Sequence, residues 1–349
     1  MISILVAVRN ESANIISCLQ SLENLNYGKN YAKDYRNQNL EILIGNDDSE
    51  DNTEELIQNF IADKPHFQLV TIKNKVAKLH GKPNVLAQLA HQAKGEWLFF
   101  TDADVQVPLN WIEEMLGDEK HENEKHEIAM ITGFTSIIPT SFFAALQALD
   151  WTFYLGCMHI FSSLNLPMTA MGNNMAVRKQ VYDAVGGYEN IAFSVTEDYA
   201  LFKTISTQGF GFQQLASEKV IAFTKPSVSL SDFIHQRQRW LGEFRNFPTW
   251  IKAMILSAGF HLPFFCLLLF FGFVIGNSAI FIVCYSLRFV LISSILAYYI
   301  HKTKQTKLFF YLIIYDLFHL LFSFIFISNF LKNLFGKSQI AWKGRIYER

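Results

Sequence analysis

The feature that most constrains this chain is a nearly unbroken apolar tract between residues 251 and 331. Three stretches of it, residues 253–275, 278–300 and 308–330, are each long enough as helices to cross a hydrocarbon core of ~30 Å at ~1.5 Å per residue. The tract is too apolar for the core of a soluble helix bundle. The sequence therefore predicts a membrane domain of two to three helical segments over residues 251–331, with a basic interfacial tail over residues 332–349.

The residues before this tract have the ordinary charge of a soluble α/β protein. The chain carries a net charge of −1, so no global field favours nucleic acid as a partner. Its four cysteines show no C-x-x-C spacing, which indicates buried thiols in a reducing compartment and neither a disulfide framework nor a zinc site. The apolar opening run has no basic segment before it, so it predicts a first strand and not a signal peptide.

Strands and helices alternate through the first hundred residues. We expect strands at 2–8, 40–44, 69–72 and 95–101, and helices at 11–25, 53–62 and 82–93. This alternation predicts a mainly parallel sheet covered by helices on both faces, whose ligands bind beyond the carboxyl ends of the strands. The polar groups that follow those ends lie in residues 9–11, 47–49 and 102–104, so three acidic clusters are expected on one rim.

Residues 141–166 form an apolar, aromatic stretch that also contains Asp150 and His159. Two interpretations stay open for it. It is either an amphipathic helix lying at the membrane surface or an ordinary core helix. We take residues 1–250, including this stretch, as one domain.

The charges of the membrane part give conflicting evidence on its topology. The basic segment 301–307 and the basic tail both favour the cytosol, yet three crossings would put them on opposite faces. Either one segment is re-entrant or the tail breaks the rule. The first segment is the candidate for re-entrance, because Pro263 and glycines interrupt it.

Two ionisable residues, Arg288 and Asp316, lie deep in the apolar tract. An unpaired charge at the centre of a bilayer costs at least ~2.5 kcal/mol. We therefore expect the two side chains to pair inside the helical bundle. The alternative is that Arg288 reaches the interface while Asp316 faces a watery crevice.

Several residues of the first domain have the chemistry of a catalytic site. Asp102 and Asp104 follow an apolar strand, and two carboxylates at this spacing can share a divalent cation with a diphosphate. The alternative for this pair is a helix-capping turn before Pro108. Asp198 stands at the start of a predicted helix, where it could act as a general base or simply favour the helix dipole, with Glu197 as the fallback base.

A third group of candidates precedes the membrane tract. Arg239 can bind a pyrophosphate bidentately, and Trp240 offers a flat face to a sugar ring or a lipid. The alternative for the Q-R-Q-R-W segment that holds them is a basic interfacial helix on anionic headgroups.

Taken together, these segments resemble the family 2 glycosyltransferases with the GT-A fold over nearly the whole chain. The resemblance rests on VAVRNE (residues 6–11), GNDDSEDNT (45–53), HGKPNVLAQLA (80–90), D-A-D (102–104), MGNNMAVRK (171–179) followed by G-G-Y, T-E-D (196–198) and Q-R-Q-R-W (236–240). Two positions depart from the family pattern, because Asn46 replaces an aspartate and Ala87 an asparagine.

The resemblance implies a fold and a set of roles. The fold is α/β, a Rossmann-like GT-A catalytic domain with a mainly parallel sheet, followed by C-terminal transmembrane helices. The implied roles are Asp198 as catalytic base; donor binding by Val8, Arg9, Glu11, Asp47, Lys82, Asp102, Asn173 and Asn174; metal binding by Asp104 and Asp102; and contact with acceptor or pyrophosphate by Gln236, Arg239 and Trp240. The implied cofactor is a divalent metal, Mg²⁺ or Mn²⁺.

The implied activity is inverting transfer of a sugar, from a UDP-sugar by preference, to a lipid or lipid-linked acceptor at the membrane. The protein is expected in the cell inner membrane as a multi-pass protein, with its catalytic domain facing the cytoplasm. A processive polysaccharide synthase and an inactive membrane scaffold with the same fold are the alternatives. The tail WKGRIYER also resembles a C-terminal segment of members that glycosylate lipids, which would bring Lys343 and Arg345 to phosphate groups; a plain basic anchor is the other interpretation.

Overall fold

The computed structural model describes residues 1–27, 39–117, 128–166, 168–191, 194, 196–240, 244, 246–334, 339–342 and 345–348. The chain divides into two compact units. The first comprises Met1–Ser136 and Met158–Lys225, and the second comprises Ile137–Cys157 and Pro226–Arg349. Lys343 lies outside the described residues, and so does the side chain of Arg345, so the expectation for the tail stays a prediction.

A seven-stranded sheet forms the centre of the first unit, in the order β3-β2-β1-β4-β7-β5-β8. Its strands are β1 (Ile2–Val8), β2 (Leu40–Asn46), β3 (Phe67–Thr71), β4 (Trp97–Asp102), β5 (Ile128–Thr132), β7 (Asn174–Arg178) and β8 (Gly211–Gln214). Every neighbouring pair is parallel except those that involve β7, which runs antiparallel to β4 and β5. The predicted mainly parallel sheet is confirmed.

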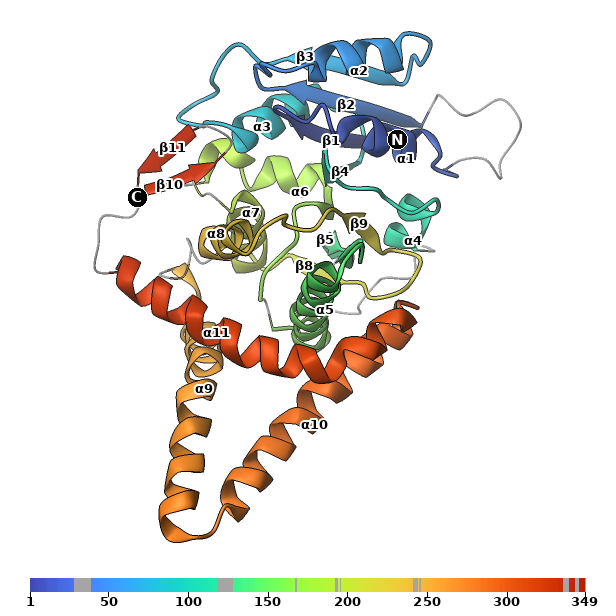
Figure 1. Ribbon diagram of the computed structural model, residues 1–349. Coiled ribbons are helices and arrows are strands. Elements are labelled where there is room, and N and C mark those ends of the chain that lie inside the picture. The colour runs from blue at the N-terminus through green and yellow to red at the C-terminus, as the bar shows by residue number, and fades with distance from the viewer. Residues whose placement is uncertain are drawn as a thin grey trace. The chain divides into compact units, whose positions relative to one another are not determined.

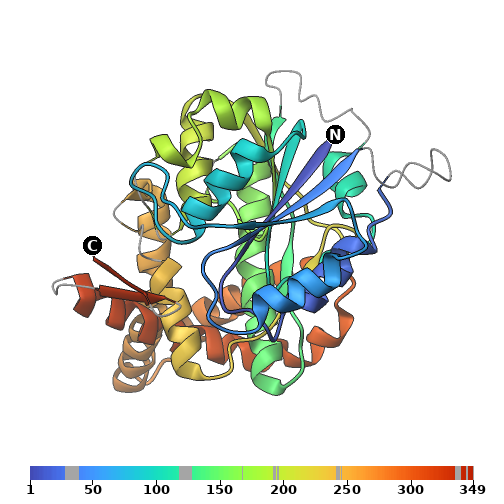
Figure 2. The ribbon, with the colours of Figure 1, turned by 90° about the horizontal axis from the view of Figure 1, so that it is seen from above.

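Helices cover both faces of this sheet (Figure 2), with α3 (Lys82–Gln92) on one side and α1 (Ile15–Glu23) and α2 (Thr53–Ile61) on the other. β1 and β4 are almost continuously buried because a covered parallel sheet exposes neither face to water. The remaining elements of this unit are α4 (Trp111–Leu116), α6 (Lys179–Ala184), η2 (Tyr188–Asn190), α7 (Glu197–Thr207) and a small sheet of β6 (Thr135–Ile137) and β9 (Ala222–Thr224).

The carboxyl ends of β2, β1 and β4 lie at one edge of the sheet. Val8 at the end of β1 is in register with Asn46 of β2, and Ala7 is in register with Asp102 of β4. The loops that leave these strands therefore start side by side, as the sequence predicted.

The second unit is helical, apart from the short antiparallel pair β10 (Gln339–Trp342) and β11 (Arg345–Glu348). Its helices are α8 (Leu230–Trp240), α9 (Thr249–Ile275), α10 (Ala279–Lys302), η4 (Thr306–Tyr311) and α11 (Leu312–Leu334), joined by the N-terminal part of α5 (Phe142–Ser163). Three helical segments of this unit are long and apolar enough to cross a membrane, namely Thr249–Ile275, Ala279–Lys302 and Thr306–Ile325. The predicted candidate membrane helices are thus confirmed by length and composition.

Two details of this unit bear on the open interpretations. Pro263 lies inside α9 without ending it, so the interruption expected in the first segment is absent from that helix. Residues 144–152 of α5 are buried on all sides, which favours the core interpretation for that part of the predicted 141–166 helix.

The expected pairing of Arg288 with Asp316 is confirmed. The Nη1 of Arg288 donates to Oδ1 of Asp316, and both side chains are almost completely buried. Tyr285 also donates its hydroxyl to Oδ2 of Asp316 at 2.6 Å, and Nη2 of Arg288 lies 3.0 Å from Nδ1 of His319. The ion pair therefore also engages a tyrosine hydroxyl and a histidine ring, while Nε of Arg288 is buried with no hydrogen-bond partner among the described residues.

This pairing can be tested by exchanging the two charges. Arg288→Asp and Asp316→Arg should each lower the yield of membrane-inserted protein, because each leaves two like charges buried together, and breaking a buried pair costs ~3–5 kcal/mol. The double exchange should restore the yield, measured by quantitative blotting of washed membranes. A double variant no better than the singles would contradict the pairing.

Candidate active site

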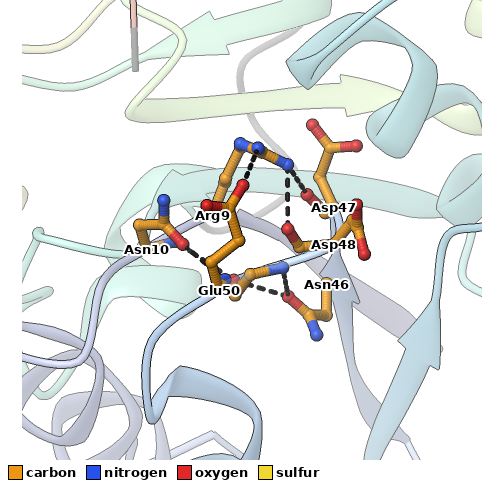
Figure 3. Close-up of polar contacts among 7 residues, drawn as sticks. Arg9, Asn10, Asn46, Asp47, Asp48 and Glu50 are labelled. Carbon is orange, nitrogen blue, oxygen red and sulfur yellow. Dashed lines mark hydrogen bonds and ion pairs between the residues drawn. The ribbon is translucent and has the colours of Figure 1, made fainter. Parts of the chain in front are cut away.

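The loop after β2 is held in place by the side chain of Arg9 (Figure 3). Its Nη1 donates to the backbone carbonyls of Asp47 at 2.5 Å and Asp48 at 2.9 Å, and its Nη2 lies 3.0 Å from Oε1 of Glu50. Asn10 completes the clamp, since its Oδ1 accepts from the N–H of Glu50 at 2.8 Å. Arg9, predicted as a donor ligand, is thus committed in this structure to ordering the loop.

This clamp leaves the Asp47 side chain to point away from the guanidinium (Figure 3). The Asp47 N–H donates to the carbonyl of Val8 at 2.9 Å, which ties the loop to the end of β1. Val8 contributes through its backbone, because its side chain is buried. The structure therefore presents the Asp47 carboxylate from a loop fixed at its backbone.

The departure from the family pattern at Asn46 has a structural reason. Its side chain is fully buried, and its Oδ1 accepts from both the N–H and the hydroxyl of Ser49, at 3.2 and 2.7 Å. Its Nδ2 donates to Oε2 of Glu54 at 2.8 Å. An aspartate could not donate to Glu54, so an amide suits this position.

Glu11, Asp102 and Asp104 gather around the thiol of Cys18. Burial raises the pKa of Cys18, and the charges of Asp104, Asp102 and Glu11 raise it further. The Glu11 N–H donates to Thr53 Oγ1 at 2.8 Å, and its carboxylate accepts from Asn14 at 2.6 Å. Two of the three predicted acidic clusters thus meet near one side chain.

The ammonium of Lys82 joins two carboxylates from distant segments. Lys82 is the first residue of α3, and its Nζ lies 2.6 Å from Oδ1 of Asp102 and 2.8 Å from Oε1 of Glu197. Burial alone would lower the pKa of Lys82, but the charges of Asp102, Glu197 and Asp198 raise it above its usual range. The end of β4, the start of α3 and the start of α7 are therefore linked through one cation.

Asp198, the predicted base, sits beside this ammonium in a cradle of backbone N–H groups. Its Oδ2 accepts from Gly172 and its Oδ1 from Tyr199, both at 2.8 Å. A Cβ at position 172 would lie 2.8 Å from the Cβ of Asp198, so only glycine permits this approach.

The protonation of Asp198 is tuned by opposing effects. Removal from water and the charge of Glu197 raise its pKa to about 6, although Lys82 and the two backbone N–H groups act in the opposite direction. A half-buried carboxylate whose pKa lies near the pH of its surroundings is suited to accept a proton from a bound hydroxyl.

Three further residues lie around the carboxylates of this site, although the sequence assigned no individual role to them. Thr224 of β9 donates its hydroxyl to Oδ2 of Asp104 at 3.1 Å, which fixes that carboxylate. Gly172 holds Asp198 as described above. The hydroxyl of Tyr188 is buried with no hydrogen-bond partner in the described part of the chain, and Glu197, Asp198 and Asp102 raise its pKa after burial has done so. The G-G-Y motif pointed to this segment but not to the hydroxyl.

The two asparagines predicted to contact a sugar differ in position. Asn173 keeps a little exposed surface, and its Oδ1 accepts from Thr135 Oγ1 at 3.0 Å. Asn174 is fully buried and its amide is used in the core: Trp111 Nε1 donates to Oδ1 at 2.8 Å, and Nδ2 donates to the carbonyls of Phe134 and Val220. The structure therefore gives Asn174 a scaffolding position.

The predicted residues Gln236, Arg239 and Trp240 lie on α8, in the second unit. That helix is anchored by Arg237, whose Nε donates to Oδ2 of Asp150 at 3.1 Å and whose Nη2 contacts the same oxygen. The guanidinium carbon of Arg237 also stacks 4.1 Å from the ring centroid of Trp240. Arg237 is buried, whereas Gln236 and Arg239 keep partial exposure.

The donor chemistry of the first unit suits a divalent cation. Among the described residues, no three histidine, cysteine, aspartate or glutamate side chains form a ready-made cation cage. Asp102, Glu197 and Asp198 nevertheless bring three carboxylates around the Lys82 ammonium, so the site is rich in oxygen ligands. Carboxylate oxygens are the ligands that Mg²⁺ and Mn²⁺ prefer, and the residues fit a cation that arrives with further oxygen ligands of its own.

The sequence matches the family model described as glycosyl transferase family 21 over residues 20–348. It is 24% identical over 294 residues to the probable glycosyltransferase YdaM of Bacillus subtilis, covering 81% of this chain and 66% of that protein. It is 26% identical over 318 residues to a poly-β-1,6-N-acetyl-D-glucosamine synthase of Staphylococcus epidermidis, covering 89% and 70%. It is 24% identical over 240 residues to a β-monoglucosyldiacylglycerol synthase of Trichormus variabilis, covering 68% and 48%. The chain thus spans between about half and about 70% of the length of these relatives.

Among solved structures, the chain is similar to the mannosyltransferase PcManGT from Pyrobaculum calidifontis, determined in complex with GDP-Man and Mn²⁺. The TM-score is 0.50 at 16% identity, covering 91% of this chain and 86% of the other. This likeness confirms the predicted GT-A type of fold.

The Lys82 contacts can be tested without reference to activity. Lys82→Met should lower the melting temperature of the detergent-solubilised protein at pH 7.5 by roughly 5 °C or more, because Asp102, Glu197 and Asp198 then repel one another without a cation. The ammonium lowers the pKa of Asp198, so in the folded variant that pKa would rise further, and the deficit is present at neutral pH and shrinks as the pH falls toward 4.5.

Lys179→Met is the matched control, since Lys179 pairs with Asp183 at 3.0 Å on the surface of the same unit. An exposed pair of this kind contributes ~0–1 kcal/mol, so its loss should leave the melting temperature nearly unchanged at every pH. Equal behaviour of the two variants at pH 7.5 would show that Lys82 does not hold the carboxylates together.

Proposed function

The chain belongs to glycosyl transferase family 21, and we propose that it transfers a sugar from a nucleotide-sugar donor, a UDP-sugar by preference, to a lipid or lipid-linked acceptor at the membrane. Transfer proceeds by a single displacement that inverts the anomeric carbon. The protein works as a multi-pass enzyme of the cell inner membrane, with the first unit in the cytoplasm. Membership of a glycosyltransferase family and the candidate membrane helices support this proposal.

The observation that carries the proposal is the environment of Asp198. Its carboxylate is held by two backbone N–H groups, lies beside a lysine that faces two further carboxylates, and has a pKa of about 6. Each carboxylate oxygen keeps a second lone pair with which to accept a proton from a hydroxyl. This combination of fixed position and raised basicity is what a general base requires.

In the proposed reaction, Asp198 takes the proton of the acceptor hydroxyl as its oxygen forms a bond to the anomeric carbon. The bond from that carbon to the diphosphate oxygen breaks, and the nucleoside diphosphate leaves with the electron pair. Lys82 offsets the growing negative charge with its ammonium. The products are a glycosylated acceptor, a nucleoside diphosphate and one proton.

The donor is assigned to the edge of the sheet. Asp47 binds the base, the backbone of Val8 and the Arg9 clamp shape its pocket, and Lys82 approaches the phosphates. Asp104, fixed by Thr224, and Asp102 hold the divalent metal, which when bound neutralises the diphosphate. PcManGT, whose fold this chain shares, was determined with GDP-Man and Mn²⁺, which supports a donor of this kind.

The acceptor site is assigned to the Q-R-Q-R-W segment of α8, because that segment precedes the candidate membrane helices. Gln236, Arg239 and Trp240 belong to a helix that leads into the membrane segments, and their chemistry suits a pyrophosphate and an amphiphilic acceptor. A β-monoglucosyldiacylglycerol synthase among the relatives supports a lipid.

A processive polysaccharide synthase is the second candidate. It is favoured by the likeness to poly-β-1,6-N-acetyl-D-glucosamine synthases, which covers 89% of this chain for the Staphylococcus epidermidis protein. The two candidates differ in product: single transfer gives one sugar per acceptor, whereas a processive enzyme gives a ladder of long chains.

The proposal is tested by incubating membranes that contain the full chain with a panel of radiolabelled nucleotide sugars and Mg²⁺ or Mn²⁺. Label from one of them should enter the lipid fraction as a product of defined length. Asp198→Asn should reduce this transfer by roughly 10²–10⁴-fold, because the amide cannot take the proton, while binding of UDP is largely retained.

Asp183→Asn serves as the control, because Asp183 is an exposed aspartate of the same unit and should retain full transfer. Retained turnover in Asp198→Asn would remove that residue from its role. Label that appears only in long water-soluble chains would favour the processive candidate, and no incorporation from any donor would contradict sugar transfer.

A further inference from the structure

The three candidate membrane segments are not equivalent. Within the apolar stretch of each segment, 17% of the residues are buried inside the protein for α9 and also for α10. The share is 39% for the third segment, which ends in α11. α9 and α10 form a hairpin whose turn begins at Gly276, a glycine in the left-handed conformation with φ of 70°. Figure 1 shows the two helices diverging from that turn as the arms of a V.

α11 has one exposed apolar face and one covered face. Ile313, Leu317, Leu321 and Phe324 are 38–71% exposed and recur every three or four residues, which places them on one stripe. The opposite side contains Tyr315, Asp316, His319, Phe322 and Ser323, all of them buried.

The covered face of α11 packs on helices that carry polar groups. The ring centroid of Phe233 on α8 lies 6.0 Å from the ring centroid of Phe318 and 4.6 Å from that of Phe322, both on α11. On α5, the ring of Phe153 lies 5.2 Å from His319, and Asp150 accepts a 3.4 Å hydrogen bond from the hydroxyl of Tyr315. α8 and α5 therefore contact the first half and the middle of α11, whereas its C-terminal half packs on α9, with Ile327 against Ile255 and Leu256.

A transmembrane course for α11 would draw α8 into the hydrocarbon. α8 exposes Ser231, Asp232 and His235, and it touches α11 near the midpoint of that helix. A charged side chain at the centre of a bilayer is energetically unfavourable. If α11 spanned the membrane, the polar side of α8 would lie near the centre of the bilayer. The polar residues on that side therefore argue against a spanning α11.

We propose that α11 lies in the plane of the membrane surface, with its exposed stripe in the acyl chains of the bilayer and its covered face toward α8, α5 and the upper parts of α9 and α10. The α9–α10 hairpin is then the part that inserts. In Figure 1, α11 crosses the open end of the V, and its C-terminal half packs there on the first part of α9. Lys302, Lys304 and Lys307 precede α11, and a basic tail follows it, so both ends meet headgroups as an interfacial helix requires.

This arrangement removes the conflict over sidedness. A hairpin returns the chain to the face from which it entered, so the segment before α9, the basic segment 301–307 and the tail all share one side of the membrane. The Arg288–Asp316 contact then lies at the depth of a surface helix and not at the bilayer centre, where an ion pair is most costly. The proposal does not depend on the sugar-transfer activity.

The test measures the depth of spin labels in vesicles of phosphatidylcholine and phosphatidylglycerol. Single cysteines replace Ile313, Leu317, Leu321 or Phe324 in the full chain, after its four native cysteines have been changed to alanine. All four labels should report the same immersion depth within about one helical turn of ~5 Å. Because these side chains are exposed, the substitutions should leave the fold intact.

α10 provides the control within the same protein, at the exposed positions Ile280, Leu287, Leu291 and Tyr298. Labels at Ile280 should lie deepest and those at Leu287 ~10 Å shallower, whereas those at Leu291 and Tyr298 should lie at or above the level of the α11 labels, because Arg288 of α10 contacts Asp316 of α11. A gradient on α11 as steep as that on α10, which would reach ~16 Å between positions 313 and 324, would overturn the proposal.

Sidedness gives a second and independent outcome. An epitope after Arg349 and one inserted at Lys304 should be cleaved by a protease from the same side of sealed vesicles as an epitope before Met1. An epitope after Arg349 that is protected while the one before Met1 is cleaved would likewise overturn the in-plane course of α11.

Discussion

The contact on which the first unit depends is that of the Lys82 ammonium with the carboxylates of Asp102 and Glu197. These residues start α3, end β4 and start α7, so one cation ties together three segments that are far apart in the chain. Glu197 and Asp198 are adjacent carboxylates with restricted access to water, and their repulsion would oppose folding without a nearby positive charge. Removal from water, followed by the repulsion of Glu197, leaves the pKa of Asp198 raised even beside the ammonium, and this raised basicity is what the proposed role as a base requires.

The second unit also contains buried charges, and there they lie among apolar helices. Asp150 with Arg237, and Asp316 with Arg288, are buried acid–base pairs whose hydrogen bonds also engage tyrosine hydroxyls. Burial raises the pKa of Asp150 even though Arg237 acts against this. Because such pairs are costly to break, they fix α8 on α5 and α10 on α11 in one arrangement. The same contacts determine which face of α11 is left for lipid.

The sequence predicted those features that depend on composition and on strand order. β1, β2 and β4 could be located within two residues, because strands buried on both faces are almost continuously apolar. Since neighbouring parallel strands end at one edge, the acidic residues that follow them could be expected together. The pairing of Arg288 with Asp316 followed from the cost of leaving either charge alone.

Other features depend on contacts that a sequence does not reveal. The Arg9 side chain donates to backbone carbonyls and orders a loop, and the Asn174 amide forms its hydrogen bonds within the core. Both residues nevertheless belong to motifs that predict contact with a ligand. Pro263 was expected to interrupt a helix, but the isolated proline is accommodated within α9. Hydropathy detects α11 as a possible span, whereas only its contacts with α8, α5 and α9 show that one of its faces is covered.

In the proposed function, Asp102, beside Lys82, and Asp104 receive a diphosphate together with a divalent cation. This proposal can be tested by isothermal titration calorimetry of UDP with the full chain, with Mn²⁺ and with EDTA. We expect binding with Mn²⁺, little or none with EDTA, and loss of the metal dependence in Asp104→Asn. Equal binding under both conditions, or an Asp104→Asn variant that responds to Mn²⁺ like the wild type, would contradict it.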